Sequence, residues 1–399
     1  MTQNNNPQFN FKILKRSSKS RARLGKITTP HGVIDTPSFI FCATKASIKG
    51  VTTQQVEEAG TQIILSNTYH LMLQPGEEIV KNAGKLHKFM NWDKPMLTDS
   101  GGFQIFSLGH GSVAQEIKGR RFTSEGRNKT LLKITEEGAI FRAYTDGRKH
   151  LLTPERSIQV QQALGADLIV VLDECTPFHV SKHYTRKSME MSHRWGQRSF
   201  DEFTRTNDGS QALYGIIQGG VYEDLRKESC DFVNSLPFFG HAIGGSLGEN
   251  KDQMKEVVDY SAKLLDERRP IHLLGIGGIS DIFYGVKAGI DTFDCVHPTR
   301  LARHGGALAK RKQSSDKEHI NLRNSQYRID TTPIESDCNC HTCNNYSKSY
   351  LHHLLKAQEL IALTLISIHN IAFMNRLLSA IRGAIQTDSL DDLQKEWLL

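Results

Sequence analysis

The sequence lacks a long hydrophobic run, and it contains no acidic residue before Asp35. No apolar stretch reaches the roughly 18 residues that a membrane-spanning helix needs, which predicts a protein without a transmembrane segment or a membrane partner. The first residues show none of the apolar core of a secretion signal, so we expect a cytoplasmic protein. Their Asn, Gln and Pro content predicts a flexible tail over residues 1–10.

Cysteine is also sparse, with 7 in 399 residues, and this odd number without a secretion signal argues against a disulfide framework. Three of the cysteines form the pattern Cys338-x-Cys340-x2-Cys343, and His369 follows further along the chain. Three thiolates and an imidazole make up the closed tetrahedral shell of structural zinc, which leaves no position to activate water. The pattern therefore predicts one structural Zn²⁺ per chain. On spacing alone, two other histidines are alternative fourth ligands: His352 and His353.

Positive charge exceeds negative charge, with 50 Lys and Arg against 43 Asp and Glu, a formal net charge of +7. This excess mildly favours a polyanionic partner such as a nucleic acid. The basic stretch before Asp35 is compatible with a transit peptide, with a solvated charged face and with a folded basic edge, which we prefer. A second basic group lies beyond Asp294 and holds more charge than one bound phosphate requires. Its members are Arg300, Arg303, His304, Lys310, Arg311 and Lys312.

The composition, with 38% hydrophobic and 23% charged residues, is that of a soluble globular protein. Short apolar or β-branched runs alternate with longer helical patterns, which is typical of parallel α/β folds. Eight such runs lie at residues 33–41, 62–65, 95–98, 167–172, 213–217, 241–243, 272–276 and 292–293. Eight buried strands favour an α/β fold of the (β/α)8 TIM-barrel type, because a doubly wound sheet more often shows fewer strands and an early phosphate-binding glycine loop.

Two additions to a plain barrel are predicted. Residues 139–152 have the pattern of an inserted hairpin, since Asp146 and Gly147 suit a two-residue turn. Beyond residue 330, a cysteine-rich loop precedes one long helical pattern over residues 349–385. We therefore divide the chain into a tail (1–10), a catalytic barrel (11–330) and a zinc-binding subdomain with C-terminal helices (331–399).

Carboxyl groups follow three of the predicted strands, at Asp99, Asp173 and Asp294. The carboxyl ends of barrel strands converge on one face, so these groups should share the mouth of the barrel. One such Asp alone would more often cap a helix. Desolvation and mutual repulsion make a cluster of three costly, which indicates chemistry or ligand binding rather than a stabilising role.

Residues beside these carboxyl groups suit a flat, purine-like ligand. Asp173 can accept from an exocyclic amine and a ring N–H, and Gln218 can pair with a carbonyl. Phe103 can stack on a base, with ordinary core packing as the alternative for this ring. The glycine-rich run at 275–278 can instead cradle a phosphate, which would indicate a small-molecule barrel enzyme.

The chain resembles the tRNA-guanine transglycosylase family, in its bacterial form and closest to chlamydial members, over nearly its whole length. The motifs that carry the resemblance are Ser66-Asn67-Thr68-Tyr69-His70-Leu71, Asp99-Ser100-Gly101-Gly102-Phe103-Gln104, Asp173-Glu174-Cys175, Gln218-Gly219-Gly220, Phe293-Asp294-Cys295, Pro298-Thr299-Arg300 and the Cys3His set. The resemblance implies a decorated barrel that works as a homodimer in queuosine biosynthesis or salvage. Its implied substrates are the wobble guanine of GUN-anticodon tRNAs, those for Asp, Asn, His and Tyr, and a 7-deazaguanine base that replaces it.

The same resemblance implies roles for single residues. Asp294 is implied as the nucleophile that attacks the ribose anomeric carbon and forms a covalent aspartyl-RNA intermediate, and Asp99 as the general acid and base. Implied base-binding residues are Ser100, Gly101, Gly102, Phe103, Asp173, Gln218, Gly245 and Ser246. Implied RNA-binding residues are Gly275, Ile276, Gly277, Gly278, Ile279, Ser280, Asp281, Thr299, Arg300, Leu301, Ala302 and Arg303.

One loop departs from the family pattern. The segment 244–249 is one residue shorter than in many bacterial members and carries Ser246 where leucine is usual. We expect these changes to give room or a hydroxyl near the base, so that the pocket admits queuine rather than preQ1 alone. Alternatively, the shorter loop re-routes the backbone and leaves the pocket narrow. A noncatalytic tRNA-binding homologue is a further alternative, against which the presence of both Asp294 and Asp99 argues.

Overall fold

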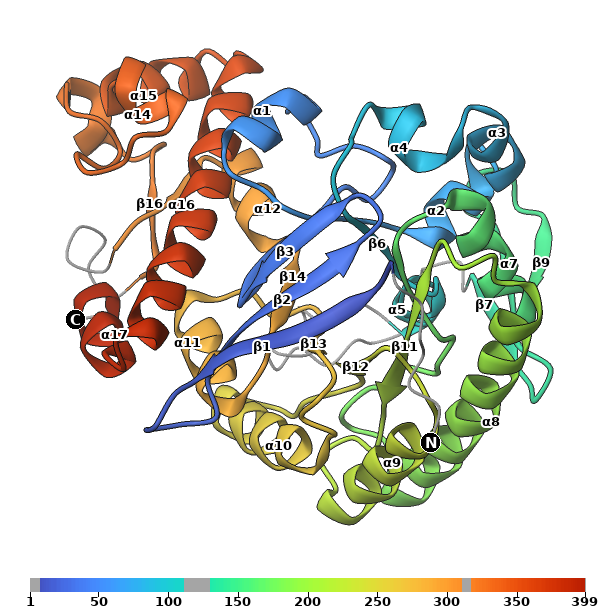
Figure 1. Cartoon of the computed structure of the whole chain (residues 1–399). Helices are drawn as coiled ribbons and strands as arrows, with labels where there is room; N and C mark the ends of the chain where they lie inside the picture. Colours follow the sequence, from blue (N-terminus) through green and yellow to red (C-terminus); the bar gives the residue numbers. More distant parts are fainter. Residues whose placement is uncertain (1–7, 111–129, 311–316, 399) are drawn as a thin grey trace.

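The computed structural model describes residues 8–110, 130–310 and 317–398. At its centre is a closed barrel of parallel strands in the spatial order β10-β11-β12-β13-β14-β4-β5-β6, with helices around it (Figure 1). The barrel strands are β4 (Ser38–Cys42), β5 (Ile64–Ser66), β6 (Met96–Thr98), β10 (Leu168–Val170), β11 (Ala212–Ile217), β12 (Gly240–Ile243), β13 (Ile271–Leu273) and β14 (Thr292–Cys295). The predicted (β/α)8 barrel is confirmed.

Helices connect successive barrel strands, as parallel strands require, and a further helix, α12, follows the last of them. They are α1 (Thr53–Glu58), α2 (Thr68–Leu73), α3 (Glu77–Asn82), α4 (Lys85–Met90), α5 (Gly102–His110), α7 (Pro154–Leu164), α8 (Lys182–Thr206), α9 (Glu223–Ser235), α10 (Lys251–Leu264), α11 (Ile279–Ala288) and α12 (His297–Arg303). Side chains mark where several begin: Ser181 accepts a hydrogen bond from the N–H of Tyr184 at the start of α8. Every residue of β11 is buried, because helices cover one side of the barrel wall and the barrel core fills the other.

The first predicted strand, 33–41, is two strands in the structure. Pro37 separates β3 (Gly32–Thr36) from β4, because a proline has no N–H to donate to a strand ladder. β3 pairs with β2 (Arg23–Thr29), and β2 with β1 (Asn10–Arg16), in an antiparallel sheet that contains the folded basic stretch. Phe9 is buried and β1 begins at Asn10, so the end of the expected tail joins this sheet. Residues 1–7 lie outside the described residues.

The predicted insertion is present, but its turn differs from the prediction. It is a three-stranded antiparallel sheet of β7 (Leu131–Ile134), β8 (Ala139–Arg142) and β9 (Lys149–Leu152). The N–H of Ala143 donates to the carbonyl of Arg148, 2.8 Å away, so the hairpin closes around a longer loop than two residues. Of the two expected turn residues, only Gly147 has a positive φ, +73°, and Asp146 instead accepts from the N–H of Arg148. The two-residue turn was wrong.

The C-terminal region contains β15 (Gly306–Leu308), β16 (His319–Asn321), the 3-10 helix η1 (Ser325–Ile329), α14 (His341–Asn345), α15 (Lys348–Lys356), α16 (Ile361–Gln386) and α17 (Leu390–Leu398). The single helix predicted over 349–385 is two helices, because Gln358 adopts a left-handed backbone with φ +62° between α15 and α16. A hydrophobic cluster separate from the barrel core runs from Ala302 through Leu322 and Cys338 to Ile366. The expected boundary at residue 331 falls within this cluster.

Helix α16 is the central element of the C-terminal region. It packs against α12, β15 and β4, and Figure 1 shows it beside α12. Among the described residues it is the one helix long and apolar enough to cross a membrane, with a mean hydropathy of 1.4 in its most apolar window. However, 67% of that window is buried inside the protein, and Arg376 and Arg382 interrupt the apolar sequence. α16 therefore uses its apolar surface as a core helix does.

At the N-terminal ends of the barrel strands, Asp167 joins three parts of the fold. Its carboxylate is fully buried and accepts from the N–H of Met96 at 2.8 Å and from Nδ1 of His31, in the turn between β2 and β3, at 2.7 Å. Nε2 of His87 in α4 lies 3.3 Å from the same carboxylate. Burial alone would raise the pKa of Asp167, but the hydrogen bond from His31 and the nearby His87 imidazole bring it down to about 2. The hydrogen bond to Asp167 in turn raises the pKa of His31.

We expect His31→Ala to lower stability in a pH-dependent way. Because the pKa of His31 is raised in the folded protein, its ion pair stabilises the fold fully below about pH 6.5 and is lost as the pH rises through the raised value. The free energy of unfolding should fall by about 1 kcal/mol at pH 6, a modest amount because the His31 side chain is 40% exposed, and by less at pH 9. Chemical denaturation at both pH values measures the difference.

The exposed His353→Ala is the matched control and should leave stability nearly unchanged at either pH. Equal destabilisation by His31→Ala at pH 6 and pH 9 would contradict a stabilising ion pair.

Candidate active site and metal site

Three carboxyl groups meet at the mouth of the barrel. Asp294 lies within β14, Asp99 directly follows β6, and Asp173 comes shortly after β10. Asp173 and Asp294 are 7% and 9% exposed. Burial, and then the negative charge of Asp294, raises the pKa of Asp99; burial, followed by the charges of Glu174 and Asp99, raises that of Asp173. The expected carboxyl cluster is therefore present.

The carboxylate of Asp294 is held mainly through one of its oxygens. Oδ1 accepts from Nε2 of His272 at 3.1 Å and from the N–H of Gly275 at 3.0 Å. Oδ2 faces the thiol of Cys42, with the sulfur 3.8 Å away. The donors to the Asp294 carboxylate thus come from both sides of β14. They lie on β13, on the loop after β13, and on β4.

The carboxylate of Asp99 receives a denser set of donors. The N–H of Thr68 donates to Oδ1 at 2.8 Å, Nε2 of Gln104 donates to Oδ2 at 2.8 Å, and the Asn67 amide donates to the same Oδ2. Burial nevertheless raises the pKa of Asp99 to about 6. A carboxyl group with such a pKa can exchange a proton near neutral pH, as a general acid and base must.

Asp173, Gln218 and Gly245 form one wall of the mouth. The side-chain amide of Gln218 donates to Oδ2 of Asp173, and burial raises the pKa of Asp173 to about 7. Gly245 has a φ of +75°, and a Cβ on it would lie 2.2 Å from Oε1 of Gln218. The wall therefore brings backbone against an amide side chain. A side chain at position 245 would strain the backbone and would require Gln218 to move.

The neighbouring Ser246 is buried, and its hydroxyl serves its own loop. Its Oγ accepts from the N–H of Gly248 at 3.4 Å.

A fully buried arginine, Arg226, binds the backbone next to this wall. The guanidinium of Arg226 in α9 donates to the carbonyls of Gly220 at 2.7 Å, Ile217 at 3.2 Å, Gly244 at 2.9 Å and Ser246 at 3.0 Å. Burial lowers the pKa of Arg226, and no carboxylate is among its hydrogen-bond partners in the described structure. Arg226 therefore fixes the backbone on both sides of the Gln218–Gly245 contact, with its charge shared among carbonyl dipoles.

Phe103, at the start of α5, is 44% exposed, so ordinary core packing was the wrong alternative for this ring. Ser100, two residues after β6, is buried, and its carbonyl accepts from the hydroxyl of Ser157 at 2.7 Å. Between them, Gly101 has a φ of +86°, and a Cβ on Gly102 would lie 2.8 Å from the carbonyl oxygen of Asp173. The segment thus passes close to the Asp173 backbone and leaves the Phe103 ring facing out.

The glycine-rich loop after β13 leads into α11, whose first N–H groups already have an acceptor. Glu318 accepts from the N–H of Ile279 at 2.9 Å and from the N–H of Ser280 at 3.0 Å. Gly275 is exposed, but its N–H is used by Asp294. Because a carboxylate of the chain occupies the N-terminus of α11, this loop does not offer the free phosphate cradle of the small-molecule alternative.

The remaining RNA-binding residues implied by sequence differ in exposure. On α12, Arg300 is exposed and Arg303 is partly buried, whereas Thr299 and Ala302 are buried. On α11, Ile279 and Asp281 are buried, and Asp281 pairs with Lys251 at 3.1 Å. Partly or fully accessible members are Gly275, Ile276, Gly278, Ser280, Arg300, Leu301 and Arg303. The expected basic residues Arg311 and Lys312 lie outside the described residues.

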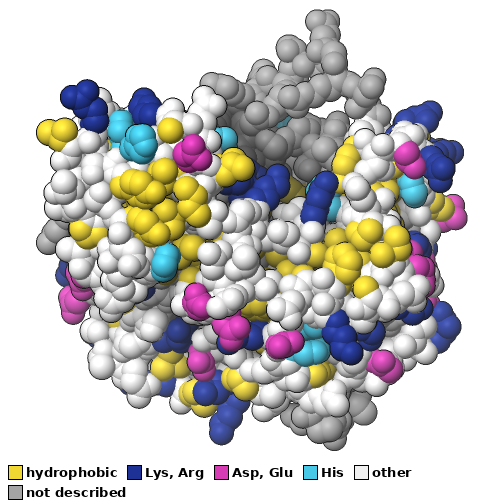
Figure 2. All heavy atoms as spheres, turned by 90° about the horizontal axis from the view of Figure 1, so that it is seen from above, with side chains coloured by type: hydrophobic (Ala, Val, Ile, Leu, Met, Phe, Trp, Pro, Cys, Tyr) yellow, Lys and Arg dark blue, Asp and Glu magenta, His cyan; other side chains and the backbone are white. Residues whose placement is uncertain are grey.

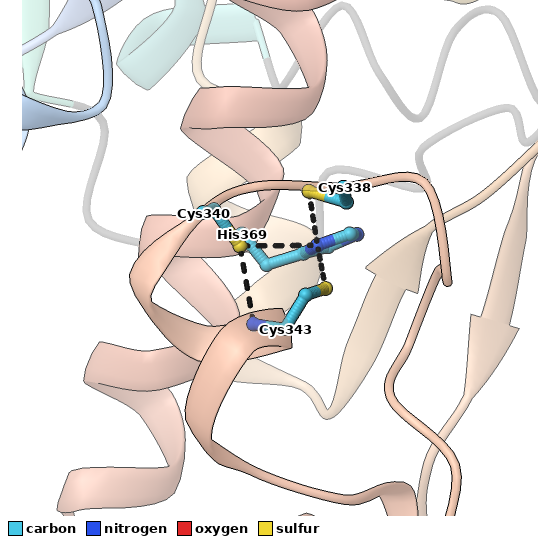
Figure 3. A group of neighbouring side chains, drawn as sticks. All are labelled: Cys338, Cys340, Cys343 and His369. Atoms are coloured by element: carbon cyan, nitrogen blue, oxygen red, sulfur yellow. Dashed lines mark hydrogen bonds between the residues drawn. The ribbon is translucent and has the colours of Figure 1, made fainter.

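Cys338, Cys340, Cys343 and His369 form a group that can hold a metal ion, with their ligand atoms all within 4.8 Å of one another (Figure 3). The three sulfurs lie 3.8, 3.8 and 3.3 Å from Nδ1 of His369. Nε2 of His369 donates to the carbonyl of Leu308 at 2.9 Å, which leaves the lone pair of Nδ1 directed at the sulfurs. The donor set and this tautomer fit a tetrahedral metal site.

The two alternative histidine ligands lie elsewhere. Nδ1 of His352 donates to the carbonyl of Leu322 at 2.8 Å, and His353 is exposed on α15. A second group with metal-ligand side chains consists of His31, His87 and Asp167 at the opposite end of the barrel. Its two imidazole rings stack 12° from parallel with centroids 3.5 Å apart, so their lone pairs do not converge on one point. In this group, both histidines instead lie against the carboxylate of Asp167.

The sequence of the chain matches known proteins over nearly its whole length. A family model described as Queuine tRNA-ribosyltransferase matches residues 17–399. The chain belongs to this family. A relative of that name from a Roseiflexus species is 48% identical over 397 residues, covering 97% of this chain and 98% of the relative. One from Protochlamydia amoebophila is 46% identical over 380 residues, covering 95% and 96%. One from a Thermoanaerobacter species is 43% identical over 388 residues, covering 97% and 96%. The resemblance inferred from the motifs, including the likeness to a chlamydial member, is confirmed.

Sequence reasoning missed the residues of this family member that support the carboxyl groups. Asn67, Thr68 and Gln104 lie in motifs that were noticed, yet their contact with Asp99 depends on folding across separate strand ends. His272 was taken only as part of a strand, and Arg226 lies in a charged helix where arginines are usually exposed. One feature of the sequence could have indicated a role for His272, because it is a polar residue at the start of an otherwise apolar strand pattern.

Proposed function

We propose that the chain is a tRNA-guanine transglycosylase that exchanges the wobble guanine of GUN-anticodon tRNAs for a 7-deazaguanine base, in queuosine biosynthesis or salvage. The observation that carries the proposal is the buried cluster of Asp99, Asp173 and Asp294 at the mouth of the barrel. Membership of the queuine tRNA-ribosyltransferase family supports the same reaction.

In the proposed reaction, Asp294 attacks the ribose anomeric carbon as the bond to guanine breaks, and guanine leaves with the bond's electron pair. Asp99 supplies a proton to guanine and later removes one from the incoming base, for which its pKa of about 6 is suited. The incoming base then displaces the carboxylate of Asp294 and restores the original ribose configuration. Two displacements through a carboxylate replace one difficult exchange.

The proposed base site uses the wall described above. The carboxylate of Asp173 accepts from the exocyclic amine and ring N–H of the base, the Gln218 amide pairs with its carbonyl, and the ring of Phe103 stacks on it. The backbone of Gly245 and Ser246 and the segment 100–102 complete the pocket. The exposed ring of Phe103 and the buried carboxyl group of Asp173 support recognition of a flat, polar ligand by this site.

For the RNA, we propose contacts from the segments 275–281 and 299–303, where Arg300 and Arg303 provide positive charge next to β14. The proposed substrates are the tRNAs for Asp, Asn, His and Tyr. A homodimer is supported by large exposed apolar side chains in the C-terminal region, Ile329, Leu360 and Ile361, which are 79%, 78% and 48% exposed. Hydrophobic side chains also gather in patches on the face seen in Figure 2. We place the protein in the cytoplasm, where its tRNA substrates are.

We assign the Cys3His group to one structural Zn²⁺ per chain. A filled shell of three thiolates and an imidazole leaves no position for a reacting water, so the ion stabilises the C-terminal region and takes no part in the exchange. The hydrogen bond from His369 to Leu308 supports this assignment, because it presents the metal-binding nitrogen in the required tautomer.

Replacing the nucleophile should abolish exchange. Asp294→Asn keeps the size of the side chain but removes its negative charge, so exchange of labelled guanine into tRNA should fall by about 10⁴-fold. Denaturing gels of enzyme mixed with tRNA should show a slow-migrating covalent species for the unaltered protein and none for the variant. Asp252→Asn, at a side chain 88% exposed on α10, is the control and should exchange normally. A covalent species in Asp294→Asn would transfer the role to another carboxylate, first Asp99.

Metal analysis should find about one zinc per chain, and its removal by a chelator should lower the unfolding temperature markedly. Cys343→Ala should lose the metal and much of its folded yield. Cys230→Ser changes a buried cysteine outside the group and should retain the metal. Fully active protein without zinc would contradict the assignment.

Base choice is tested by steady-state kinetics with queuine and preQ1. Because the segment 244–249 is short and carries Ser246, we expect queuine to be used. Ser246→Leu should reduce kcat/KM for queuine more than for preQ1, whereas Ser246→Ala separates the effect of room from that of the hydroxyl. If preQ1 has a far higher kcat/KM and queuine neither exchanges nor competes, the shorter loop does not widen the pocket.

A further inference from the structure

The two oxygens of the Asp294 carboxylate have unequal surroundings. Oδ1 accepts two N–H hydrogen bonds, from Nε2 of His272 and from the backbone of Gly275. Among the hydrogen bonds of the described residues, Oδ2 has only the Cys42 thiol, a weak donor with its sulfur 3.8 Å away. An oxygen that accepts two strong hydrogen bonds is less available to attack carbon than one that accepts a weak one. The geometry therefore distinguishes Oδ1, which is held by two donors, from Oδ2, which is only weakly held.

The orientation of His272 follows from its two partners. The ring is 2% exposed, and its Nδ1 lies 2.9 Å from Oγ1 of Thr292. Because Asp294 offers only acceptor lone pairs as a carboxylate, Nε2 must carry the hydrogen that lies between them. In the neutral ring Nδ1 is then an acceptor, and the hydroxyl of Thr292 donates to it. One tautomer satisfies all three residues.

The strands build this arrangement directly. His272 and Thr292 are paired residues in the parallel ladder of β13 and β14. Thr292 and Asp294 are two residues apart on β14, so their side chains point to the same face of the strand. The sequence pattern Thr-x-Asp beside a paired histidine thus places a hydroxyl, an imidazole and a carboxylate in a row.

We propose that Thr292 and His272 form a positioning relay that holds Oδ1 of Asp294 and leaves Oδ2 to attack the ribose. The proposal rests on the nucleophilic role of Asp294. The lone pair of Oδ2 forms the bond to the anomeric carbon, the bond from that carbon to guanine breaks, and guanine takes a proton from Asp99. Oδ1 becomes the carbonyl oxygen of the ester and keeps both donors. When the incoming base displaces the ester, the same donors stabilise the returning negative charge.

His272 contacts Asp294, and Thr292 contacts His272. Neither acts on the ribose in the proposed reaction, so their loss should affect the chemical steps more than binding. Thr292→Val removes the hydroxyl at nearly constant shape and should lower kcat about 10-fold, with the KM values for tRNA and base nearly unchanged. Thr292→Ser restores the hydroxyl and should restore kcat. His272→Leu removes the donor to Oδ1 and should lower kcat about 100-fold.

His241→Leu is the matched control. His241 is a fully buried histidine on the adjacent β12, with neither ring nitrogen hydrogen-bonded in the described structure, and its replacement should leave kcat unchanged. Unfolding temperatures of all variants separate a loss of folded protein from a loss of rate.

The covalent species separates this proposal from the role of Asp294 itself. His272→Leu and Thr292→Val should still form the aspartyl-RNA adduct, but slowly, whereas Asp294→Asn should form none. Normal kcat in both relay variants, or a change confined to KM, would overturn the relay while leaving the nucleophile in place. Failure of Thr292→Ser to recover activity would also overturn it. An adduct in Asp294→Asn would instead overturn the proposed function.

Discussion

Burying several carboxyl groups in one barrel mouth is the constraint on which most of the local structure depends. Each group loses water and repels the others, so each needs donors from the protein. Those donors come from neighbouring strand ends: Asn67 and Thr68 for Asp99, Gln218 for Asp173, and Gly275 with His272 for Asp294. The loops after the strands are therefore arranged to supply hydrogen-bond donors to the buried carboxyl groups.

The C-terminal region is tied to the same mouth through α16. Two consecutive residues of this helix contact different parts of the C-terminal region. His369 lies among the three cysteines and donates to the carbonyl of Leu308, and Asn370 donates to the carbonyls of Pro298 and Gly306. Pro298 belongs to α12, which directly follows the strand that carries Asp294. The Cys3His group and the start of α12 thus share one helix, although that group lies outside the carboxyl cluster.

Sequence alone predicted the barrel, the positions of its strands and the carboxyl cluster, because period, strand length and polar residues at strand ends are local signals. It did not predict the break at Pro37 between β3 and β4, since the run 33–41 stays apolar through it and only pairing partners distinguish two sheets. The left-handed Gln358 was hidden for a similar reason, because glutamine is ordinarily a good helix residue. Arg226 and His272 could not be assigned, because their roles depend on contacts across separate elements.

The close contact between Gly245 and Gln218 limits how the proposed base site can change in sequence. Position 245 has a positive φ, and an added Cβ would meet the end of the Gln218 side chain, so any larger residue there strains the backbone and requires Gln218 to move. Arg226 holds the adjoining carbonyls, so the backbone there cannot drift by small steps either. In the proposed base site, a change in the size of the accepted base therefore requires insertion or deletion in the segment 244–249. Under that proposal, selectivity changes in discrete steps that follow the length of this loop.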